Sequence, residues 1–426
     1  MSHIETLCVQ AGYTPKNGEP RILPITQSTT YKYDTNEAMA ALFDLAPGYM
    51  YTRLSNPTCD AVAARIAALE GGVGGVLTAS GQSANFFALF NIMQAGDHFI
   101  STSNIYGGTF NLFGVTMKKM GIEVTFVDPN ADDETFHKAF RPNTKAFFSE
   151  SVANPSLVVC DFERFVKIAH EHGVPVIVDN TFPTPVNCRP IEYGVDIVTH
   201  STTKYMDGHA ATVGGCIVDS GNFDWFAHAD RYPMMTTPDD SYHGVTYAKD
   251  FGKMGYLVKI TAQLMRDLGS TPAPQNAFYI NLGLETLALR MERHVQNAQK
   301  VAEYLQKDPR VSFVSFPGLK SDPGYELAQK YMKNGETCGV ISFGVKGGRE
   351  KAIKFMNALK LAAIVTHVAD VRTCVLHPAS STHRQLSDEQ LIACGVAPDL
   401  VRLSVGIEHV EDIIADLDQA LAAAEA

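Results

Sequence analysis

The chain has 426 residues, more than one compact core usually holds, so we expect at least two domains. Its hydrophobic content of 45% and charged content of 19% are typical of a globular protein with a large interior. A net charge of −11 without a Lys/Arg-rich stripe argues against a nucleic-acid partner, and no apolar run approaches the roughly 20 residues of a membrane helix.

The first 56 residues predict an extended arm, and regular alternation begins after it. Strand-like runs are predicted at 74–80, 97–102, 123–128, 144–150, 174–179, 195–200 and 214–219. Helical stretches between them are predicted at 57–70, 82–94, 107–119, 132–140 and 161–172. Strands separated by helices predict an α/β fold with a mostly parallel central sheet covered on both faces.

The second half of the chain predicts a smaller unit. Residues 221–275 are less regular, and a long helical pattern starts at about 276. Strand-like runs follow at 311–316, 339–345 and 400–408, with helices between them. We therefore predict an arm over 1–56, a large domain over 57–275 and a C-terminal α+β domain over 276–426.

The cysteines and the opening residues indicate the compartment. The eight cysteines are scattered without a C-x-x-C pair, which favours reduced thiols over a disulfide framework or a zinc site. "MSHIETLCVQAGYTP" contains no apolar signal segment, so we expect a cytoplasmic protein. His377 and His383 form a loop pair without further ligands, and we interpret them as structural.

Polar residues gather where the predicted strands end. In a parallel sheet, ligands bind beyond the carboxyl ends of the strands. The candidate segments are 80–82, 104–107, 150–155, 179–181 and 201–204.

Lys204 is the most unusual of these residues, because it follows the apolar strand in "VDIVTHSTTKYMDGH". A partly desolvated amine is the group that binds a carbonyl cofactor such as pyridoxal phosphate covalently. The cofactor also requires donors for its phosphate, for which Ser80-Gly81-Gln82 caps the next helix. Ser201 and Thr203 add hydroxyl donors beside the lysine.

Two further demands of the cofactor have candidates on the same rim. Asp179 ends an apolar strand, where a buried carboxylate suits a protonated ring nitrogen. Tyr106 follows another strand and supplies an aromatic ring for stacking. Taken singly, such residues more often serve as a helix cap, a turn former, a packing ring or a solvated lysine. Their combination on one rim favours the cofactor site.

Three motifs in this order carry a family resemblance: "SESVANPS", "VIVDNTF" and "HSTTKYMDGH". The chain resembles the Cys/Met-metabolism class of pyridoxal-phosphate enzymes, from "PITQSTTY" to "VRLSVGIE". This resemblance implies the aminotransferase-like fold, called fold type I. It also implies a homo-oligomer, a dimer or a homotetramer, whose active sites are shared between subunits.

The resemblance implies a role for each matching residue. Lys204 would carry the cofactor and act as base and acid, with Tyr106 stacking on the ring and assisting proton movement. Asp179 would pair with the ring nitrogen and Asn154 would lie beside the ring hydroxyl. The phosphate would be held by Gly81, Gln82, Ser201 and Thr203, and by Tyr51 and Arg53 of "YTRLSNPT" from the neighbouring subunit. Arg402 would bind the substrate carboxylate, with Asn154 nearby.

Within the class, the chain is most similar to the O-acetylhomoserine sulfhydrylases. The segment between Lys204 and "GLETLALRMERH" is longer than in the cystathionine enzymes. Gly108 stands where methionine γ-lyases place a cysteine, which argues against that lyase. One stretch departs from the sulfhydrylase pattern, since it reads His367-Val368-Ala369-Asp370 instead of Asn-Val-Gly-Asp.

The resemblance therefore implies a γ-replacement in methionine biosynthesis: O-acetyl-L-homoserine and sulfide, or methanethiol, give L-homocysteine, or methionine, and acetate. The alternatives are a cystathionine γ-synthase or an O-succinylhomoserine sulfhydrylase, and further off a methionine γ-lyase or a non-catalytic protein of the same fold. A sulfur-carrier protein is an alternative sulfur donor.

Overall fold

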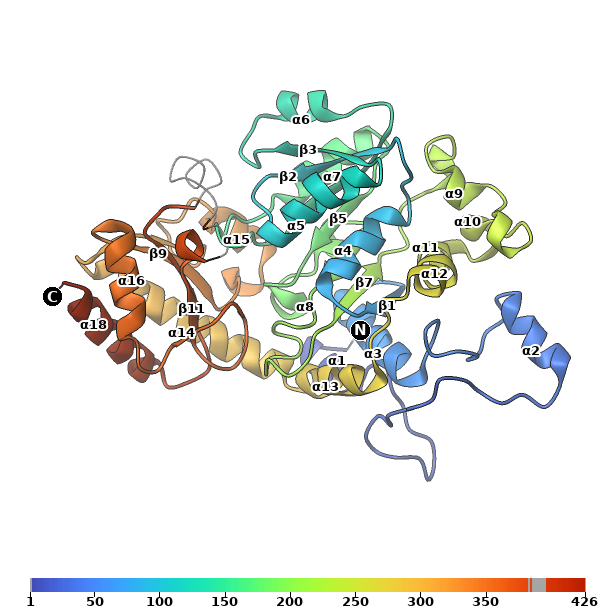
Figure 1. Ribbon diagram of the computed structural model, residues 1–426, viewed down its shortest axis with the longest axis horizontal. Helices are drawn as coiled ribbons and strands as arrows, with labels where there is room; N and C mark the ends of the chain where they lie inside the picture. The colour runs from blue at the N-terminus through green and yellow to red at the C-terminus, as the bar shows by residue number, and fades with distance from the viewer. Residues whose placement is uncertain (1, 382–383, 385–395, 426) are drawn as a thin grey trace.

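The structure is a computed structural model that describes residues 2–381, 384 and 396–425. His383 and Cys394 lie outside the described residues. The described chain forms two β-sheets flanked by helices, with the larger sheet in the middle of the molecule and the smaller one in its C-terminal part (Figure 1).

The larger sheet has seven strands in the order β1-β7-β6-β5-β4-β2-β3. Six of them run in the same direction, whereas β7 runs opposite to them and pairs antiparallel with both β1 and β6. The strands are β1 (Gly74–Thr78), β2 (His98–Thr102), β3 (Glu123–Val127), β4 (Thr144–Glu150), β5 (Val176–Asp179), β6 (Ile197–His200) and β7 (Gly215–Asp219). The mostly parallel sheet expected from the sequence is confirmed, and each of its seven predicted strands is present.

Alternate side chains of each central strand enter different cores. Val176 and Val178 of β5 belong to one buried cluster, whereas Ile177 between them belongs to a second. Because successive strand residues point to opposite faces, this places one core on each side of the sheet. The helices that cover the two faces are α3 (Pro57–Glu70), α4 (Gly81–Phe90), α5 (Gly107–Asn111), α6 (Asp133–Ala139), α7 (Phe162–Glu171) and α8 (Thr184–Asn187).

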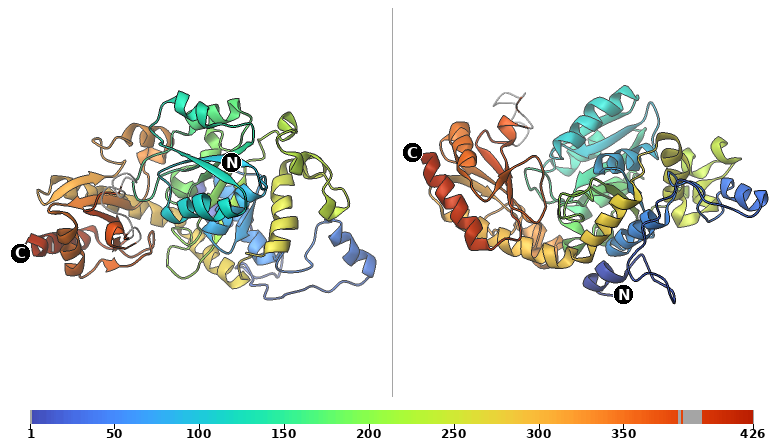
Figure 2. Two further views of the ribbon diagram at one scale, coloured as in Figure 1. Left: turned by 45° about the horizontal axis from the view of Figure 1, so that its top comes forward. Right: turned by 60° about the horizontal axis from the view of Figure 1, so that its bottom comes forward.

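The N-terminal arm contains α1 (Ile4–Gln10) and α2 (Asn36–Phe43), and the part around α2 projects from the body of the molecule (Figures 1 and 2). Residues 221–275, which the sequence predicted to be irregular, form short helices: α9 (Pro233–Thr236), α10 (Tyr247–Asp250), α11 (Gly255–Lys259) and α12 (Arg266–Leu268). Two π-helical segments, Leu112–Met117 and Ile260–Met265, extend α5 and α11.

The smaller sheet has the order β10-β11-β12-β9-β8. Its strands are β8 (Val311–Ser315), β9 (Val340–Val345), β10 (Ala363–Ile364), β11 (Cys374–Leu376) and β12 (Leu400–Ser404). This sheet packs with α14 (Leu287–Lys307), α16 (Gly348–Ala358) and α18 (Val410–Glu425). A shorter helix, α15 (Tyr325–Tyr331), lies between β8 and β9 in the chain. The long helical pattern from 276 is divided at Thr286 between α13 (Pro274–Glu285) and α14.

Among the described residues, none of the helices combines the length and apolar character needed to cross a bilayer. The seven described cysteines are free and buried. His377 bonds to the Ser380 hydroxyl at 2.8 Å and to the Pro398 carbonyl at 2.9 Å, which is a structural role within its loop. The domain limits at 56/57 and 275/276 stay a prediction.

Candidate active site

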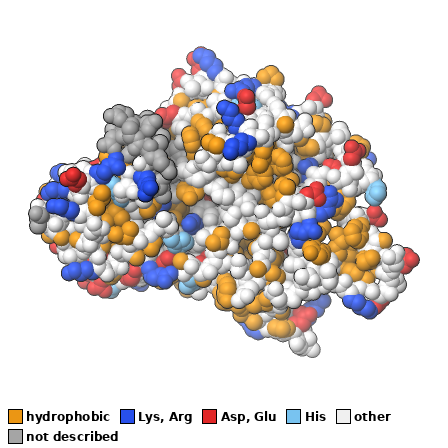
Figure 3. All heavy atoms as spheres, in the orientation of Figure 1, with side chains coloured by type: hydrophobic (Ala, Val, Ile, Leu, Met, Phe, Trp, Pro, Cys, Tyr) orange, Lys and Arg blue, Asp and Glu red, His pale blue; other side chains and the backbone are white. Residues whose placement is uncertain are grey.

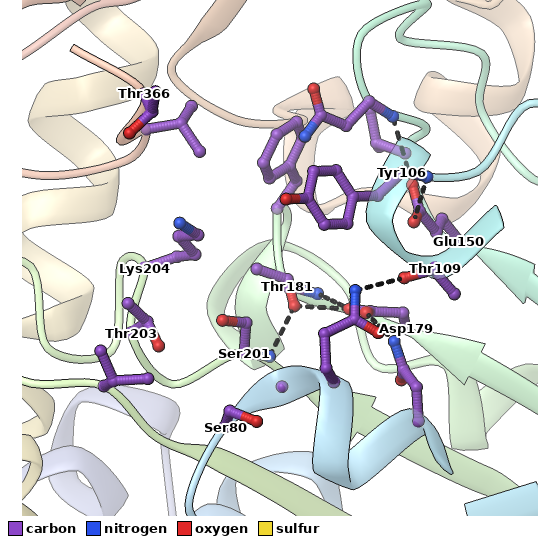
Figure 4. A pocket seen from close by; sticks show the side chains of 18 of the residues that line it. Ser80, Tyr106, Thr109, Glu150, Asp179, Thr181, Ser201, Thr203, Lys204 and Thr366 are labelled. Carbon is purple, nitrogen blue, oxygen red and sulfur yellow. Dashed lines mark hydrogen bonds between the residues drawn. The ribbon is translucent and has the colours of Figure 1, made fainter. Parts of the chain in front are cut away.

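A cavity of about 250 Å³ lies beyond the carboxyl ends of β4, β5 and β6. Figure 4 shows the Lys204 side chain and the Tyr106 ring pointing into the same space. The lining comes from both sheets and comprises Ser80, Gly81, Gln82, Asn85, Tyr106, Thr109, Glu150, Val152, Asn154, Asp179, Thr181, Phe182, Ser201, Thr203, Lys204, Val213, Thr366, Val368 and Arg402. Nine of the eleven predicted site residues therefore line one cavity.

Lys204 lies in the turn that follows β6. Its backbone N–H donates to the Ser201 carbonyl at 3.2 Å, and its own carbonyl accepts from Gly208 N–H at 2.7 Å, which fixes the turn. Within the described part of the chain, the side-chain amine has no hydrogen-bond or ion-pair partner. Burial, and next the positive charge of Arg402, lower the pKa of Lys204 to about 8. The charged form therefore still predominates at physiological pH, but a much larger share of this amine is neutral than of an ordinary lysine.

The first turn of α4 packs against the segment before Lys204. Ser80 is the N-cap, and its hydroxyl accepts from Ser83 N–H at 3.1 Å. A Cβ atom on Gly81 would lie 2.6 Å from Ser201 Cβ, so only glycine permits this approach. The side-chain oxygen of Gln82 is buried and has no hydrogen-bond partner among the described residues. The Thr203 hydroxyl is engaged with backbone groups of Gly214 at 3.1 Å.

Asp179 is the last residue of β5 and lines the cavity. One carboxylate oxygen accepts from the backbone N–H of Thr181 at 3.0 Å and from the Thr181 hydroxyl. The other accepts from Asn85 Nδ2 at 3.1 Å. Asn85 in turn accepts from the Thr199 hydroxyl of β6 at 2.5 Å, so the orientation of Asp179 is set by neighbours on three elements.

Tyr106 and Asn154 belong to the loops that follow β2 and β4. Both donate a backbone N–H to Glu150: Tyr106 at 2.8 Å and Asn154 at 3.2 Å. Added at Gly108, a Cβ atom would lie 2.6 Å from the Tyr106 ring, so a side chain at 108 would displace that ring.

Arg402 reaches the cavity from β12 of the smaller sheet. Its Nη1 donates to Asn154 Oδ1 at 3.3 Å, and its Nη2 donates to the His367 carbonyl at 3.1 Å. Its Nε is buried and has no hydrogen-bond partner in the part of the chain that the structure describes. Two more strands of that sheet hold the same loop, because Ser342 of β9 donates to the Pro155 carbonyl at 2.6 Å and Ser315 of β8 donates to the Ser156 carbonyl at 3.1 Å.

The segment that departs from the sulfhydrylase pattern contacts Arg402 through its backbone. His367 offers its carbonyl, whereas its Nε2 lies 3.8 Å from Asp370 Oδ2 and has no hydrogen-bond partner among the described residues. Ala369 is buried with a φ of 68°, a left-handed conformation that glycine adopts more easily. Its N–H donates to Ser404 Oγ at 2.7 Å, which holds the segment beside β12.

Tyr51 and Arg53 do not line the cavity of their own chain. The Arg53 guanidinium stacks 5.1 Å from the centre of the Tyr51 ring and donates to the Arg266 carbonyl. Tyr51 is 40% exposed. Their predicted role at the site of a neighbouring subunit stays a prediction.

Sequence reasoning assigned no role to three polar residues that shape the cavity: Asn85, which it missed, and Glu150 and Thr181, which lie in the candidate segments 150–155 and 179–181. Glu150 ends an apolar strand as Asp179 does, so the same signal could have identified it. Asn85 lies one helical turn after Gly81, a spacing that places both at the same end of one helix face. Thr181 follows Asp179 by two residues, the usual spacing of a turn that hydrogen-bonds an aspartate.

The chain is similar over nearly its full length to characterised sulfur-metabolism enzymes. It is 48% identical to homocysteine synthase of Schizosaccharomyces pombe over 423 residues, which cover 98% of each chain. It is 44% identical to the O-acetyl-L-homoserine sulfhydrylase of Leptospira meyeri, with 98% of this chain and 96% of the relative covered.

A solved structure agrees. The crystal structure of a proposed O-acetylhomoserine (thiol)-lyase from Campylobacter jejuni, 38% identical, superposes with a TM-score of 0.95 over 99% of this chain and 100% of the other. That protein contains a pyridoxyl-lysine monophosphate. The family model of the Cys/Met metabolism PLP-dependent enzymes matches residues 5–422. The chain belongs to the family of Cys/Met metabolism PLP-dependent enzymes.

Proposed function

We propose that the chain replaces the γ-acetoxy group of O-acetyl-L-homoserine by sulfide and so forms L-homocysteine and acetate. Methanethiol in place of sulfide would give methionine. The observation that carries this proposal is the half-buried Lys204 amine, which has no partner among the described residues, in a cavity that also contains Asp179 and Arg402. The names of the full-length relatives support the choice of substrate.

The residues of the cavity fit pyridoxal phosphate. The close contact of Gly81 with Ser201 brings the N-terminus of α4 and the Ser201 hydroxyl together, where they would hold the phosphate. Asp179 Oδ2 accepts one hydrogen bond from protein, so it can accept another from the ring N–H. The Tyr106 ring would stack on the cofactor and Asn154 would face its ring hydroxyl.

Lys204 moves the protons of the reaction. When bound, pyridoxal phosphate supplies an electron sink that acidifies the substrate carbons. The neutral Lys204 amine removes the proton from the substrate Cα, after which a second proton leaves Cβ and acetate leaves Cγ. Sulfide then adds at Cγ and the protons return. A lysine pKa of about 8 suits this exchange, because the amine must act as base and as acid.

Arg402 and Tyr106 orient the substrate. The Nε of Arg402 has no partner, so the guanidinium can bind a carboxylate while Asn154 and the His367 carbonyl hold its other edge. The Tyr106 ring is 46% exposed at the entrance, where its hydroxyl would assist proton movement near the leaving group.

We also propose a cytoplasmic homo-oligomer, a dimer or a tetramer. Met39 and Phe43 of α2 are 41% and 58% exposed, and hydrophobic side chains gather at this end of the molecule in Figure 3. A second subunit that covered this arm could receive Tyr51 and Arg53 at its own cavity. The sulfur donor is free sulfide in our proposal, and a carrier-protein thiocarboxylate is the alternative.

Replacement of Lys204 tests the proposal. Lys204→Ala should lose turnover and also the visible absorption of a lysine-bound cofactor, because both depend on this amine. Borohydride reduction followed by peptide mapping should label Lys204 in the wild-type protein. A wild-type enzyme that is active but unlabelled at this position would contradict the assignment.

Lys259 is a matched control. Burial lowers its pKa to about 8 as well, but its amine donates to the Asn91 carbonyl at 3.0 Å and lies outside the cavity. Lys259→Ala should lower the melting temperature and leave the absorption of bound cofactor intact.

The substrate is tested by steady-state rates with O-acetyl-L-homoserine and its succinyl ester, each with sulfide and with cysteine. The highest kcat/KM should belong to the acetyl ester with sulfide. A preference for the succinyl ester with cysteine would instead identify a cystathionine γ-synthase.

A further inference from the structure

Glu150 is a buried carboxyl that lines the cavity and that the proposed mechanism does not use. It is the last residue of β4 and is 8% exposed. In the register of β4 and β5, Glu150 is the direct partner of Asp179, so both side chains emerge at the same edge of the sheet. Two carboxyl groups therefore share one side of the cavity.

Neither positive charge of the cavity neutralises Glu150. The charged groups that line the cavity are Asp179 of β5, Lys204 after β6 and Arg402 of β12, and in the described chain none of them forms an ion pair with Glu150. Burial, and next the charge of Asp179, raise the pKa of Glu150 well above its usual value. An ionised Glu150 would lie beside the Asp179 carboxylate without a positive partner among the described residues, so this arrangement favours a Glu150 that keeps its proton.

The contacts of Glu150 connect two parts of the site. Oε1 accepts the backbone N–H of Tyr106 at 2.8 Å, and Oε2 accepts the backbone N–H of Asn154 at 3.2 Å. Tyr106 supplies the stacking ring, and the Asn154 side chain holds Arg402. A substitution of Glu150 would therefore disturb both the ring that stacks on the cofactor and Arg402, which binds the substrate carboxylate in the proposed mechanism.

We propose that Glu150 is a positioning residue which, as a neutral carboxylic acid, fixes Tyr106 and Asn154 around the cofactor and leaves Asp179 as the carboxylate for the ring nitrogen. This inference rests on the proposed function, because it assumes that Tyr106 and Asn154 contact pyridoxal phosphate.

Three substitutions of Glu150 test whether it acts as a neutral acid, as an anion, or only as a side chain that fills space. Glu150→Gln keeps the length, the neutrality and a carbonyl acceptor. Glu150→Asp keeps the carboxyl group but is too short to reach both N–H groups, and Glu150→Met keeps the volume without an acceptor. Apoenzyme of each variant is titrated with pyridoxal phosphate, and the dissociation constant is read from the visible absorption of bound cofactor.

We expect Glu150→Gln, whose single carbonyl oxygen still accepts one of the two N–H groups, to bind more tightly than Glu150→Met, which should bind about tenfold more weakly than wild type or worse because both buried N–H groups lose their acceptor. The KM for the amino-acid substrate should rise more than kcat falls in Glu150→Met, since Arg402 is held through Asn154. Infrared difference spectra of the apoenzyme should contain a protonated-carboxyl band that Glu150→Gln lacks.

Asp322 provides a matched control in the C-terminal part. Burial raises its pKa, and it accepts two backbone N–H groups, those of Phe316 and Gly324, at 2.8 Å each. Asp322→Asn should lower the melting temperature without changing the dissociation constant of the cofactor.

The outcomes are distinct. Cofactor binding of Glu150→Met equal to wild type would overturn the positioning role. If Glu150→Met does not fold, the comparison of Glu150→Asp with Glu150→Gln tests the proposal. Tighter cofactor binding by Glu150→Asp than by Glu150→Gln would contradict the claim that Glu150 acts as a neutral acid. A wild-type apoenzyme that takes up no pyridoxal phosphate would contradict the proposed function itself, and this inference with it.

Discussion

The half-buried Lys204 and the buried Lys259 show that a perturbed pKa alone does not identify a catalytic group. Burial lowers the pKa of both amines to about 8. Lys259 donates to a backbone carbonyl and serves the fold, whereas Lys204 is unpaired in the described chain and faces a cavity. The cavity and the missing partner, together with the pKa, distinguish the reactive amine.

The pH dependence of cofactor uptake should follow the Lys204 amine. Only the neutral amine attacks an aldehyde, so the rate at which apoenzyme gains visible absorption should rise with pH, with a midpoint at about 8. Arg402→Met removes a positive charge that lowers this pKa, so its midpoint should move to higher pH. Arg372→Met, at a side chain 64% exposed to solvent, should leave the midpoint in place. An unchanged midpoint in Arg402→Met would refute the coupling.

Asp179 should be more sensitive to loss of charge than to a change in length. Asp179→Ala and Asp179→Asn should lower kcat by about a hundredfold or more, because the ring nitrogen loses its carboxylate. Asp179→Glu should cost less, since a carboxylate is retained. Equal, mild losses in rate for all three variants would make Asp179 a structural residue that only holds Asn85 and Thr181.

At the scale of the element, the close packing of α4 on the Ser201 segment creates the donor end of the cavity. The helix begins at Gly81 because Ser80 is a good N-cap, and the glycine permits backbone contact that any other residue would prevent. The same junction places the helix N-terminus, with its partial positive charge, beside the Ser201 hydroxyl.

Gly81→Ala tests this junction. Its Cβ would lie 2.6 Å from Ser201 Cβ and 2.8 Å from Ser201 Cα, so α4 and the Ser201 segment must separate. We expect the affinity for pyridoxal phosphate to fall about tenfold or more, measured by titration of apoenzyme. Gly114→Ala is the control, because its Cβ would meet the Phe126 ring at an ordinary 3.4 Å. Equal affinities in the two variants would show that the contact is not needed.

The strands of the large sheet could be predicted because their signal is local. Val176, Ile177 and Val178 are apolar in succession, as expected where both faces of a strand are covered. β10 and β11 could not be predicted, since two and three residues are too short to show a period. The antiparallel direction of β7 could not be predicted either, because the residues of a strand do not encode its direction in the sheet.

The site was predictable to the extent that its residues follow strands. Lys204 and Asp179 stand out as polar residues after apolar runs, and a family motif pointed to Arg402. Thr366 was missed and Val368 was noted only within the stretch that departs from the family pattern, because both enter the cavity through the packing of a distant segment against β12. No local pattern shows which loop of a second sheet will meet the first.

At the scale of the whole molecule, the contacts within one chain do not account for the N-terminal arm. Tyr51 and Arg53 stack on each other away from the cavity of the same chain, while apolar residues of α2 face solvent. Exposed apolar side chains on a projecting segment are typical of a surface that another subunit covers.

Mixing two inactive variants tests whether sites are shared. If Arg53 acts at a neighbour's cavity, Arg53→Ala and Lys204→Ala subunits that exchange at equal amounts should regain about a quarter of the wild-type activity, because half of the dimers then contain one intact site. Arg53→Ala alone should also bind pyridoxal phosphate more weakly. Lys204→Ala mixed with Asp179→Ala is the comparison, and an equal gain there, or no gain with Arg53→Ala, would contradict shared sites.

The loop Asn154–Ser156 belongs to the large sheet by sequence, yet β8, β9 and β12 each donate a hydrogen bond to it. The two halves of the protein are therefore not interchangeable modules. A chimera that joins the N-terminal half of one relative to the C-terminal half of another must therefore keep this loop together with its three donors, Ser315, Ser342 and Arg402. Without them, the two halves would meet in the wrong geometry at the active site.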